Sequence, residues 1–324
     1  MPRLDDIAAL SPNLLSLPYV RQLTDHPEKY GTAVTKPGGV TLVDCGVKAK
    51  GGWEAGVLFA NICLGGLASV SLTWGDFAGL RWPAVEVVTD HPLRACMASQ
   101  YAGWMVKTDS YFAMGSGPAR AAYGNEELFA KKLGGYKDTA GTAVLCLESN
   151  KLPDEQTALW LAERCGVAPG DMYILVAPTA SPVGSVQIAA RSVETGLHKL
   201  AELGYDLGKI ESGWGLAPAP PVPGDDMTAL GRTNDAILYG TTVHYTLTDE
   251  DANLEILLQK IPSSASKDYG EPFGEIFKRS GYNFYDIDPL LFSPAKVLLS
   301  NRKTGRSFTA GEIRTDLLER SFSL

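Results

Sequence analysis

The stretch TAVLCLESNKLPDEQTALWLAERCGVAPGDMYILVAPT, residues 142–179, decides the fold that the sequence predicts. Its two ends, 142–149 and 172–179, are short apolar runs bounded by polar and turn-forming residues, a pattern typical of β-strands. Between them, residues 154–165 have acidic residues in the first turn and apolar positions at helical spacing. Gly166 follows as a stop signal, so the segment predicts a strand, a helix and a second strand.

The rest of the chain repeats these signals less regularly. Strand-like runs occupy 38–47, 84–90, 237–247 and 295–311, and a further helix is predicted over 185–203. Some strand runs follow one another directly whereas helices separate others, which favours a mixed α+β (mixed α/β) fold over a regular doubly wound sheet. A chain of 324 residues is long enough for two domains. We expect two interleaved α/β domains, roughly 1–165 and 166–324, with a cleft between them and chain crossovers.

Proline and glycine concentrate in 216–226, which is predicted to be an extended connection joining the lobes. A Ser-rich connection covers 262–272, and such loops often carry binding residues, so Ser263 and Ser264 are candidate substrate contacts.

Composition excludes several classes of function. The net charge of −8 and a pI near 5.1 argue against a nucleic-acid partner, which would need a basic stripe. The uncharged segment 55–75 is long enough to span a bilayer, but its four glycines and its polar residues favour a buried element of a soluble protein, so no membrane partner is expected. Asp5 and Asp6 interrupt any signal sequence, which predicts a cytoplasmic protein. The five cysteines are widely spaced and are read as buried thiols.

The segment FAMGSGPARAAYG, residues 112–124, predicts a strand, a Gly-rich loop and a helix start. Glycines let successive backbone N–H groups point into one concavity, so Gly115, Ser116 and Gly117 could cradle an anion with Arg120 nearby. The loop is neither GxGxxG nor a P-loop. The alternative is a tight turn that needs glycine for steric reasons.

A run of nineteen uncharged residues, 172–190, leads to Arg191 and Glu194. If 185–203 is one helix, these two side chains share a face at i, i+3, surrounded by small residues that leave room for another molecule. A weak ion pair on the helix surface is the alternative, and the pattern alone favours that alternative.

Other polar residues give weaker signals. Asn234 and Asp235 offer amide and carboxylate groups suited to a heterocycle, although Asn and Asp before a β-run often only form a turn. The four histidines show no ligand spacing, so no metal site is predicted.

Several motifs together resemble the methenyltetrahydromethanopterin cyclohydrolases over nearly the whole chain. They are VDCGV, NICLGGLA, YFAMGSGPARA, LVAPTASPVGSVQIAARSVETG, GRTNDAILYG, PSSASKDYGEPF, FYDIDP and FSPAKV. The resemblance implies reversible hydrolysis of the cationic N5,N10-methenyl bridge of a reduced pterin, or of its dephospho form, to the N5-formyl compound. It also implies no metal or prosthetic group, and a homotrimer of two-domain subunits with the pterin between the domains.

In this resemblance the catalytic Arg and Glu of the family fall on Arg191 and Glu194, through the motif ARSVETG. Archaeal members read QKAGW where this chain has Tyr101 in QYAGW, so the role of a lysine there is open and Tyr101 is a candidate substrate contact. Attack of water on an amidinium-like carbon calls for a general base, and Glu194 is the candidate. Two alternatives stay open: a catalytically idle pterin-binding protein, and a phosphate-ester or nucleotide enzyme that uses the 115–120 loop. The acidic charge favours a bacterial setting with a role in one-carbon oxidation, as in methylotrophy.

Overall fold

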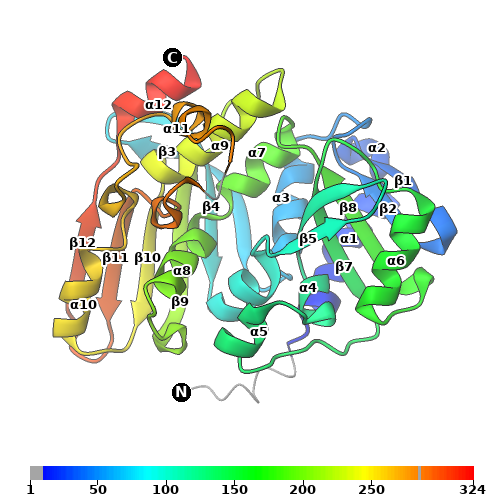
Figure 1. The fold of residues 1–324 in the computed structure, drawn as a ribbon, viewed down its shortest axis with the longest axis horizontal. Helices are drawn as coiled ribbons and strands as arrows, with labels where there is room; N and C mark the ends of the chain where they lie inside the picture. The colour runs from blue at the N-terminus through cyan, green and yellow to red at the C-terminus, as the bar shows by residue number, and fades with distance from the viewer. Residues whose placement is uncertain (1–9, 284–285) are drawn as a thin grey trace. The chain divides into compact units, whose positions relative to one another are not determined.

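The fold is described here from a computed structural model covering residues 10–283 and 286–324 (Figure 1). The chain divides into two compact units. The first comprises the described residues up to Ala68 together with Leu93–Gln187, and the second comprises Ser69–Pro92 and Ile188–Leu324. Asp5, Asp6 and the first two residues of the FYDIDP motif lie outside the described residues.

The first unit is built on a six-stranded mixed sheet, within the residues described. Its strands, in sheet order, are β1 (Ala33–Thr35), β2 (Thr41–Asp44), β8 (Met172–Ala177), β7 (Ala143–Glu148), β6 (Phe112–Ser116) and β5 (Trp104–Lys107). β2, β8 and β7 run parallel, and the remaining neighbours are antiparallel. The helical segments of this unit are α1 (Pro12–Asp25), α2 (Pro27–Tyr30), η2 (Pro37–Gly39), α3 (Trp53–Cys63), the π-helix η3 (Leu93–Gln100), α4 (Ala119–Tyr123), α5 (Glu127–Lys132), α6 (Glu155–Cys165), η4 (Pro169–Asp171) and α7 (Pro182–Ala189), which begins here.

The predicted strand, helix and strand of 142–179 are confirmed as β7, α6 and β8. The Asp154 side chain caps α6 by accepting a hydrogen bond from the Thr157 backbone N–H. Hydrogen bonds from the Thr157 hydroxyl, the Thr157 N–H and the Ser110 hydroxyl together lower the pKa of Asp154 to about 2. Gly166 ends the helix in the left-handed conformation that glycine adopts at little cost. The crossover helix lets β7 and β8 pair in parallel.

Apolar side chains pack on both faces of this sheet. One core combines Leu145, Leu147 and Ile174 with Leu161 of α6 and Ala119 of α4. The opposite core combines strand residues such as Val144 and Leu175 with side chains of α1 and α3. Because β7 and β8 are buried on both sides, their sequences are almost continuously apolar.

The second unit has its own six-stranded mixed sheet among the described residues. Its strands, in sheet order, are β12 (Ser307–Gly311), β11 (Lys296–Asn301), β10 (Thr242–Leu247), β9 (Ile210–Pro218), β4 (Leu80–Thr89) and β3 (Ser69–Phe77). β10 and β11 are parallel and the other neighbours antiparallel. The helical segments are α8 (Ser192–Glu202), η5 (Leu207–Lys209), α9 (Asp226–Gly240), α10 (Asp251–Leu258), η6 (Ser263–Ala265), α11 (Phe273–Arg279), η8 (Pro289–Leu291) and α12 (Thr315–Phe322).

Glycines in β9 let α8 approach the second sheet closely. A Cβ added to Gly213 would lie 2.5 Å from Val193 Cγ1, and one added to Gly215 would lie 2.2 Å from Ser192 Oγ. Tyr245 of β10 donates a hydrogen bond from its hydroxyl to the Val193 carbonyl at 2.6 Å. The first turn of α8 is thereby fixed on the sheet.

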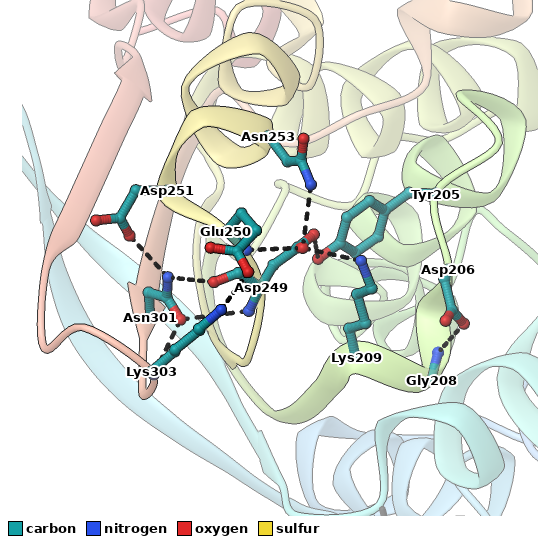
Figure 2. A network of polar contacts seen from close by, with 10 residues as sticks. All are labelled: Tyr205, Asp206, Gly208, Lys209, Asp249, Glu250, Asp251, Asn253, Asn301 and Lys303. Carbon is teal, nitrogen blue, oxygen red and sulfur yellow. Dashed lines mark hydrogen bonds and ion pairs between the residues drawn. The ribbon is translucent and has the colours of Figure 1, made fainter.

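A polar network centred on Asp249 lies where β10 and β11 end in the second sheet (Figure 2). Its carboxylate accepts hydrogen bonds from Lys209 Nζ at 2.8 Å and from the Tyr205 hydroxyl at 3.1 Å. Asn301, at the end of β11, donates from Nδ2 to the Asp249 carbonyl and to the Asp251 carboxylate. Burial opposes ionisation of Asp249, but the hydrogen bonds, led by that from Lys209, outweigh it and lower its pKa.

Two predictions of secondary structure are wrong in part. The helix predicted over 185–203 is two helices, α7 and α8, separated near Arg191. The physical reason is that Val186 of α7 packs against Gly56 in the first unit whereas α8 packs against β9 in the second, so the two parts of the predicted apolar stripe are buried in different units. The strand predicted over 237–247 begins only at Thr242, because 237–240 form the last turn of α9, buried on several sides.

The segment 55–75 matches the expectation of a buried element only in part. Residues 55–63 belong to the largely buried α3, whereas 69–75 belong to β3, in which most residues are exposed. In the described part of the chain, no helix has the length and apolar character needed to cross a membrane. The connection predicted over 216–226 does not join the two units, because β9 and α9 on either side of it both belong to the second unit. Its first three residues are the end of β9, at Pro218.

Candidate active site

Arg191 and Glu194 form an ion pair at the start of α8 in the second unit. Arg191 Nη1 lies 3.6 Å from Glu194 Oε2, at i, i+3. The arginine side chain is 13% exposed and the glutamate side chain 7% exposed. The pair is therefore largely buried, which distinguishes it from the solvent-exposed pair that the sequence pattern alone favoured.

The local backbone explains how the two side chains meet. Arg191 is the N-cap of α8, with φ −83° and ψ 8°, and its carbonyl accepts hydrogen bonds from the Thr195 backbone N–H and hydroxyl. Glu194 lies in the first turn, where the unpaired N–H groups of the helix favour a negative charge. The arrangement holds a carboxylate beside a guanidinium in a place with little solvent.

Ser192 lies between these two residues and is fully buried. Among the described residues, its hydroxyl has no hydrogen-bond partner. Burying a hydroxyl without a hydrogen-bond partner costs free energy. The burial of the Ser192 hydroxyl therefore calls for an explanation.

Further along α8, Lys199 is also fully buried. Its Nζ donates to the Leu290 carbonyl of η8. Burial lowers the pKa of Lys199 to about 8, and the nearby Asp288 carboxylate partly opposes that shift. Sequence reasoning missed this lysine, because it was read as part of an ordinary helix.

The 115–120 loop lies in the first unit. Gly115 and Ser116 end β6, and the Ser116 hydroxyl donates to the Gln100 carbonyl at 2.5 Å. Gly117 has φ +94°, and its N–H donates to the Ser99 carbonyl. The loop is thus a tight turn that requires glycine, with α4 following as a helix of five residues.

Arg120 is fully buried and its guanidinium is engaged within the first unit. It forms a bidentate ion pair with Glu126, at 2.8 and 2.6 Å, and donates to the carbonyls of Met97 and Ser99. Its Cζ also lies 5.1 Å from the ring centroid of Tyr101. Arg120, Tyr101, Ser116 and Gly117 therefore come together around the end of η3, whereas the role of this group in binding an anion or a pterin stays a prediction.

Asn234 and Asp235 lie on α9 in the second unit. Asn234 Nδ2 donates to the Leu230 carbonyl within the helix. Asp235 is buried, and its two carboxylate oxygens accept from the Phe273 backbone N–H at 2.7 Å and the Ser321 hydroxyl at 2.6 Å. Burial raises the pKa of Asp235 to about 7 against these hydrogen bonds. Its contacts join α9, α11 and α12.

Ser263 is buried and donates its hydroxyl to the Leu238 carbonyl, whereas Ser264 is exposed. The second unit also has a pocket of about 270 Å³. It is lined by Asp268, Ile276, Arg279, Ser280, Asp286 and Ile287, residues outside the predicted site. Within residues 10–283 and 286–324, no group of three or more His, Cys, Asp or Glu side chains is arranged to hold a metal ion.

One polar cluster of the first unit escaped the sequence analysis. Glu148, the last residue of β7, accepts hydrogen bonds from the Thr179 hydroxyl at 2.6 Å and from Gln187 Nε2 at 2.9 Å. The available signal was an acidic residue at the carboxyl end of a buried strand, a position where α/β proteins often bind ligands.

Comparison with known proteins places the whole chain in one family. The family described as Cyclohydrolase (MCH) matches residues 11–322. A methenyltetrahydromethanopterin cyclohydrolase of Methanococcoides burtonii is 48% identical over 288 residues, covering 88% of this chain and 89% of that protein. Those of Methanocaldococcus jannaschii and Methanosarcina mazei are 45% and 42% identical, covering 96–97% of this chain and 98–99% of theirs. The chain therefore belongs to the methenyltetrahydromethanopterin cyclohydrolase family.

Proposed function

We propose that this chain hydrolyses the N5,N10-methenyl bridge of methenyltetrahydromethanopterin, or of its dephospho form, to the N5-formyl compound, with Glu194 and Arg191 as the catalytic pair. The observation that carries the assignment of residues is the largely buried Arg191–Glu194 ion pair at 3.6 Å. Family membership supports the reaction itself.

In the proposed mechanism, Glu194 acts first as a general base. A water oxygen attacks the methenyl carbon while Glu194 takes one proton from the water, which gives a neutral tetrahedral adduct. The C–N10 bond then breaks, N10 takes the proton back from Glu194, and the hydroxyl of the adduct becomes the formyl oxygen by releasing its proton to solvent. In the net reaction, one methenyl pterin cation and one water are converted into one neutral formyl pterin and one proton.

Arg191 is proposed to orient the Glu194 carboxylate, since its Nη1 lies 3.6 Å from Glu194 Oε2. The substrate itself is a cation. By pairing with Glu194, Arg191 also prevents the glutamate carboxylate from forming a tight ion pair with the methenyl bridge.

The test is the variant Glu194→Gln, which keeps the size of the side chain and removes the base. We expect turnover to fall by about 100-fold or more, in line with the loss of a general base, while pterin binding is retained. The readout is the decay of the methenyl pterin absorbance, with the exposed Glu202→Gln of the same helix as control. Near-normal turnover in Glu194→Gln would remove this residue from the mechanism. Binding without turnover in the unchanged protein would instead support an idle pterin-binding protein.

Three further properties belong to this proposal. The reaction as written needs no metal or prosthetic group, and activity that survives exhaustive chelation would support this. A homotrimer and a cytoplasmic location rest on the family resemblance and the sequence. Light scattering after size exclusion tests the trimer against a mass of 34.7 kDa per chain. A role in one-carbon metabolism, such as methylotrophic oxidation, follows from the substrate.

A further inference from the structure

The first sheet has an uncovered apolar strip at its β5–β6 edge. Met105, Phe112 and Met114 are 55%, 59% and 37% exposed. On the opposite face of the same strands, Trp104 and Val106 are buried in the core that includes α6. Exposed side chains of this size, gathered at one place, are typical of a binding surface.

Strand register places Glu148 beside this strip. Met105 pairs with Met114 across β5 and β6, and Met114 pairs with Glu148 across β6 and β7. Directly paired residues of antiparallel strands project on the same face, with Cβ atoms roughly 5 Å apart. A carboxylate therefore borders an apolar floor made of two thioethers.

The Glu148 carboxylate is held in place and keeps acceptor capacity. Thr179 and Gln187 each donate to a different carboxylate oxygen. Each oxygen of a carboxylate has a second lone pair, so both can accept one more hydrogen bond. The two donors are neutral, and hence neither offsets the negative charge of Glu148. The side chain is also only partly buried.

We propose that Glu148 recognises the pyrimidine edge of the pterin and that Met105 and Met114 form the floor beneath the ring system. This inference rests on the proposed function. A pterin presents two adjacent donors, N3–H and the 2-amino group, which match the two oxygens of one carboxylate. A flat ring that carries a cationic bridge suits polarizable sulfur and a nearby negative charge. Gln187, which holds Glu148, precedes the predicted catalytic Arg191 by four residues in the sequence.

The experiment compares methenyl pterin with its 2-deamino analogue in the full-length protein. In the unchanged protein, kcat/KM for the analogue should be lower by about 10- to 100-fold, because a site built to accept a hydrogen bond rejects a ligand that lacks it. In Glu148→Gln, KM for the methenyl pterin should rise about 10-fold or more with kcat changed less than about threefold. The variant should also lose most of its discrimination between the two compounds. Glu163→Gln, an exposed glutamate of α6, is the matched control.

Each outcome decides between specific roles. Equal kcat/KM for both compounds in the unchanged protein overturns recognition of the 2-amino group, and so does undiminished discrimination in Glu148→Gln. Loss of thermal stability with unchanged discrimination would mean that Glu148 has a purely structural role.

If Glu148→Gln does not fold, the double variant of the exposed pair, Met105→Ala with Met114→Ala, tests the proposal instead. KM for the methenyl pterin should rise in that variant. An unchanged KM with a changed oligomeric mass would make the strip a contact between copies. Absence of turnover in the unchanged protein would instead refute the proposed function.

Discussion

The buried carboxyl of Asp235 makes the stability of the second unit depend on pH. The pKa of Asp235 is raised to about 7 in the folded chain, chiefly by burial, against a usual value of 3.8. Hydrogen bonds from Ser321 and Phe273 favour the charged form, and the nearby Glu275 and Arg320 act in opposite directions. The folded chain therefore holds a proton that the unfolded chain releases between about pH 4 and pH 7.

This difference fixes the sign and size of the effect. The contribution of Asp235 is fully present below the unfolded pKa and is lost as the pH rises through the folded pKa. A shift of about three units at 1.36 kcal/mol per unit amounts to about 4 kcal/mol of unfolding free energy lost between pH 4 and pH 7. The variant Asp235→Asn keeps the shape and an acceptor for the Phe273 N–H but cannot ionise, so it should lose this dependence.

The assay is urea unfolding followed by circular dichroism at pH 5, 6, 7 and 8. The stability of Asp235→Asn relative to the unchanged protein should increase through pH 7, by up to about 1.4 kcal/mol per unit. Glu319→Gln, at an exposed position of α12, controls for the loss of one negative charge. Parallel pH profiles for Asp235→Asn and the unchanged protein would refute the reasoning, because they would mean that Asp235 binds protons equally in both states.

Three further changes probe the 115–120 loop and the start of α8. Arg120→Met leaves the Glu126 carboxylate without its bidentate partner, so chemical denaturation should show a loss of about 3–5 kcal/mol. Gly117→Ala places a side chain at φ +94° and 3.3 Å from Cys146, which should lower stability by at least about 1–2 kcal/mol; an unchanged melting temperature would contradict the need for glycine. Ser192→Ala removes a buried hydroxyl that has no described partner, so unfolding should show a change within about 1 kcal/mol or a gain. A marked loss of turnover in a stable Ser192→Ala would show that this hydroxyl binds water or substrate.

Local signals predicted much of the fold. The helix at 155–165 carries its own start and stop, Asp154 and Gly166, and both cap as the sequence indicates. The strands on either side were recognisable because burial on both faces makes them continuously apolar. These features depend on neighbours in the sequence, which is why pattern reasoning reaches them.

What the sequence could not predict depends on contacts between distant segments. The break between α7 and α8 arises because each helix packs on a different unit, a fact that no local periodicity records. The hydrogen bonds that Arg120 donates to Glu126 and to carbonyls of η3 could likewise not be predicted from the sequence. The Arg191–Glu194 spacing was correct, but its burial was not foreseeable from pattern, and only the family resemblance singled the pair out. Glu148 was overlooked because its partners come from beyond β8.

The pairing of β4 with β9 has a consequence for synthesis of the chain. β4 ends at Thr89, and the strand that covers its free edge begins only at Ile210. A ribosome that adds roughly 5–20 residues per second needs on the order of 10 s to make the intervening ~120 residues. During that interval the β3–β4 hairpin exposes unpaired N–H and C=O groups along one edge, a template for association with other nascent chains. Production of this protein should therefore improve when chaperones are abundant enough to protect that hairpin until β9 emerges.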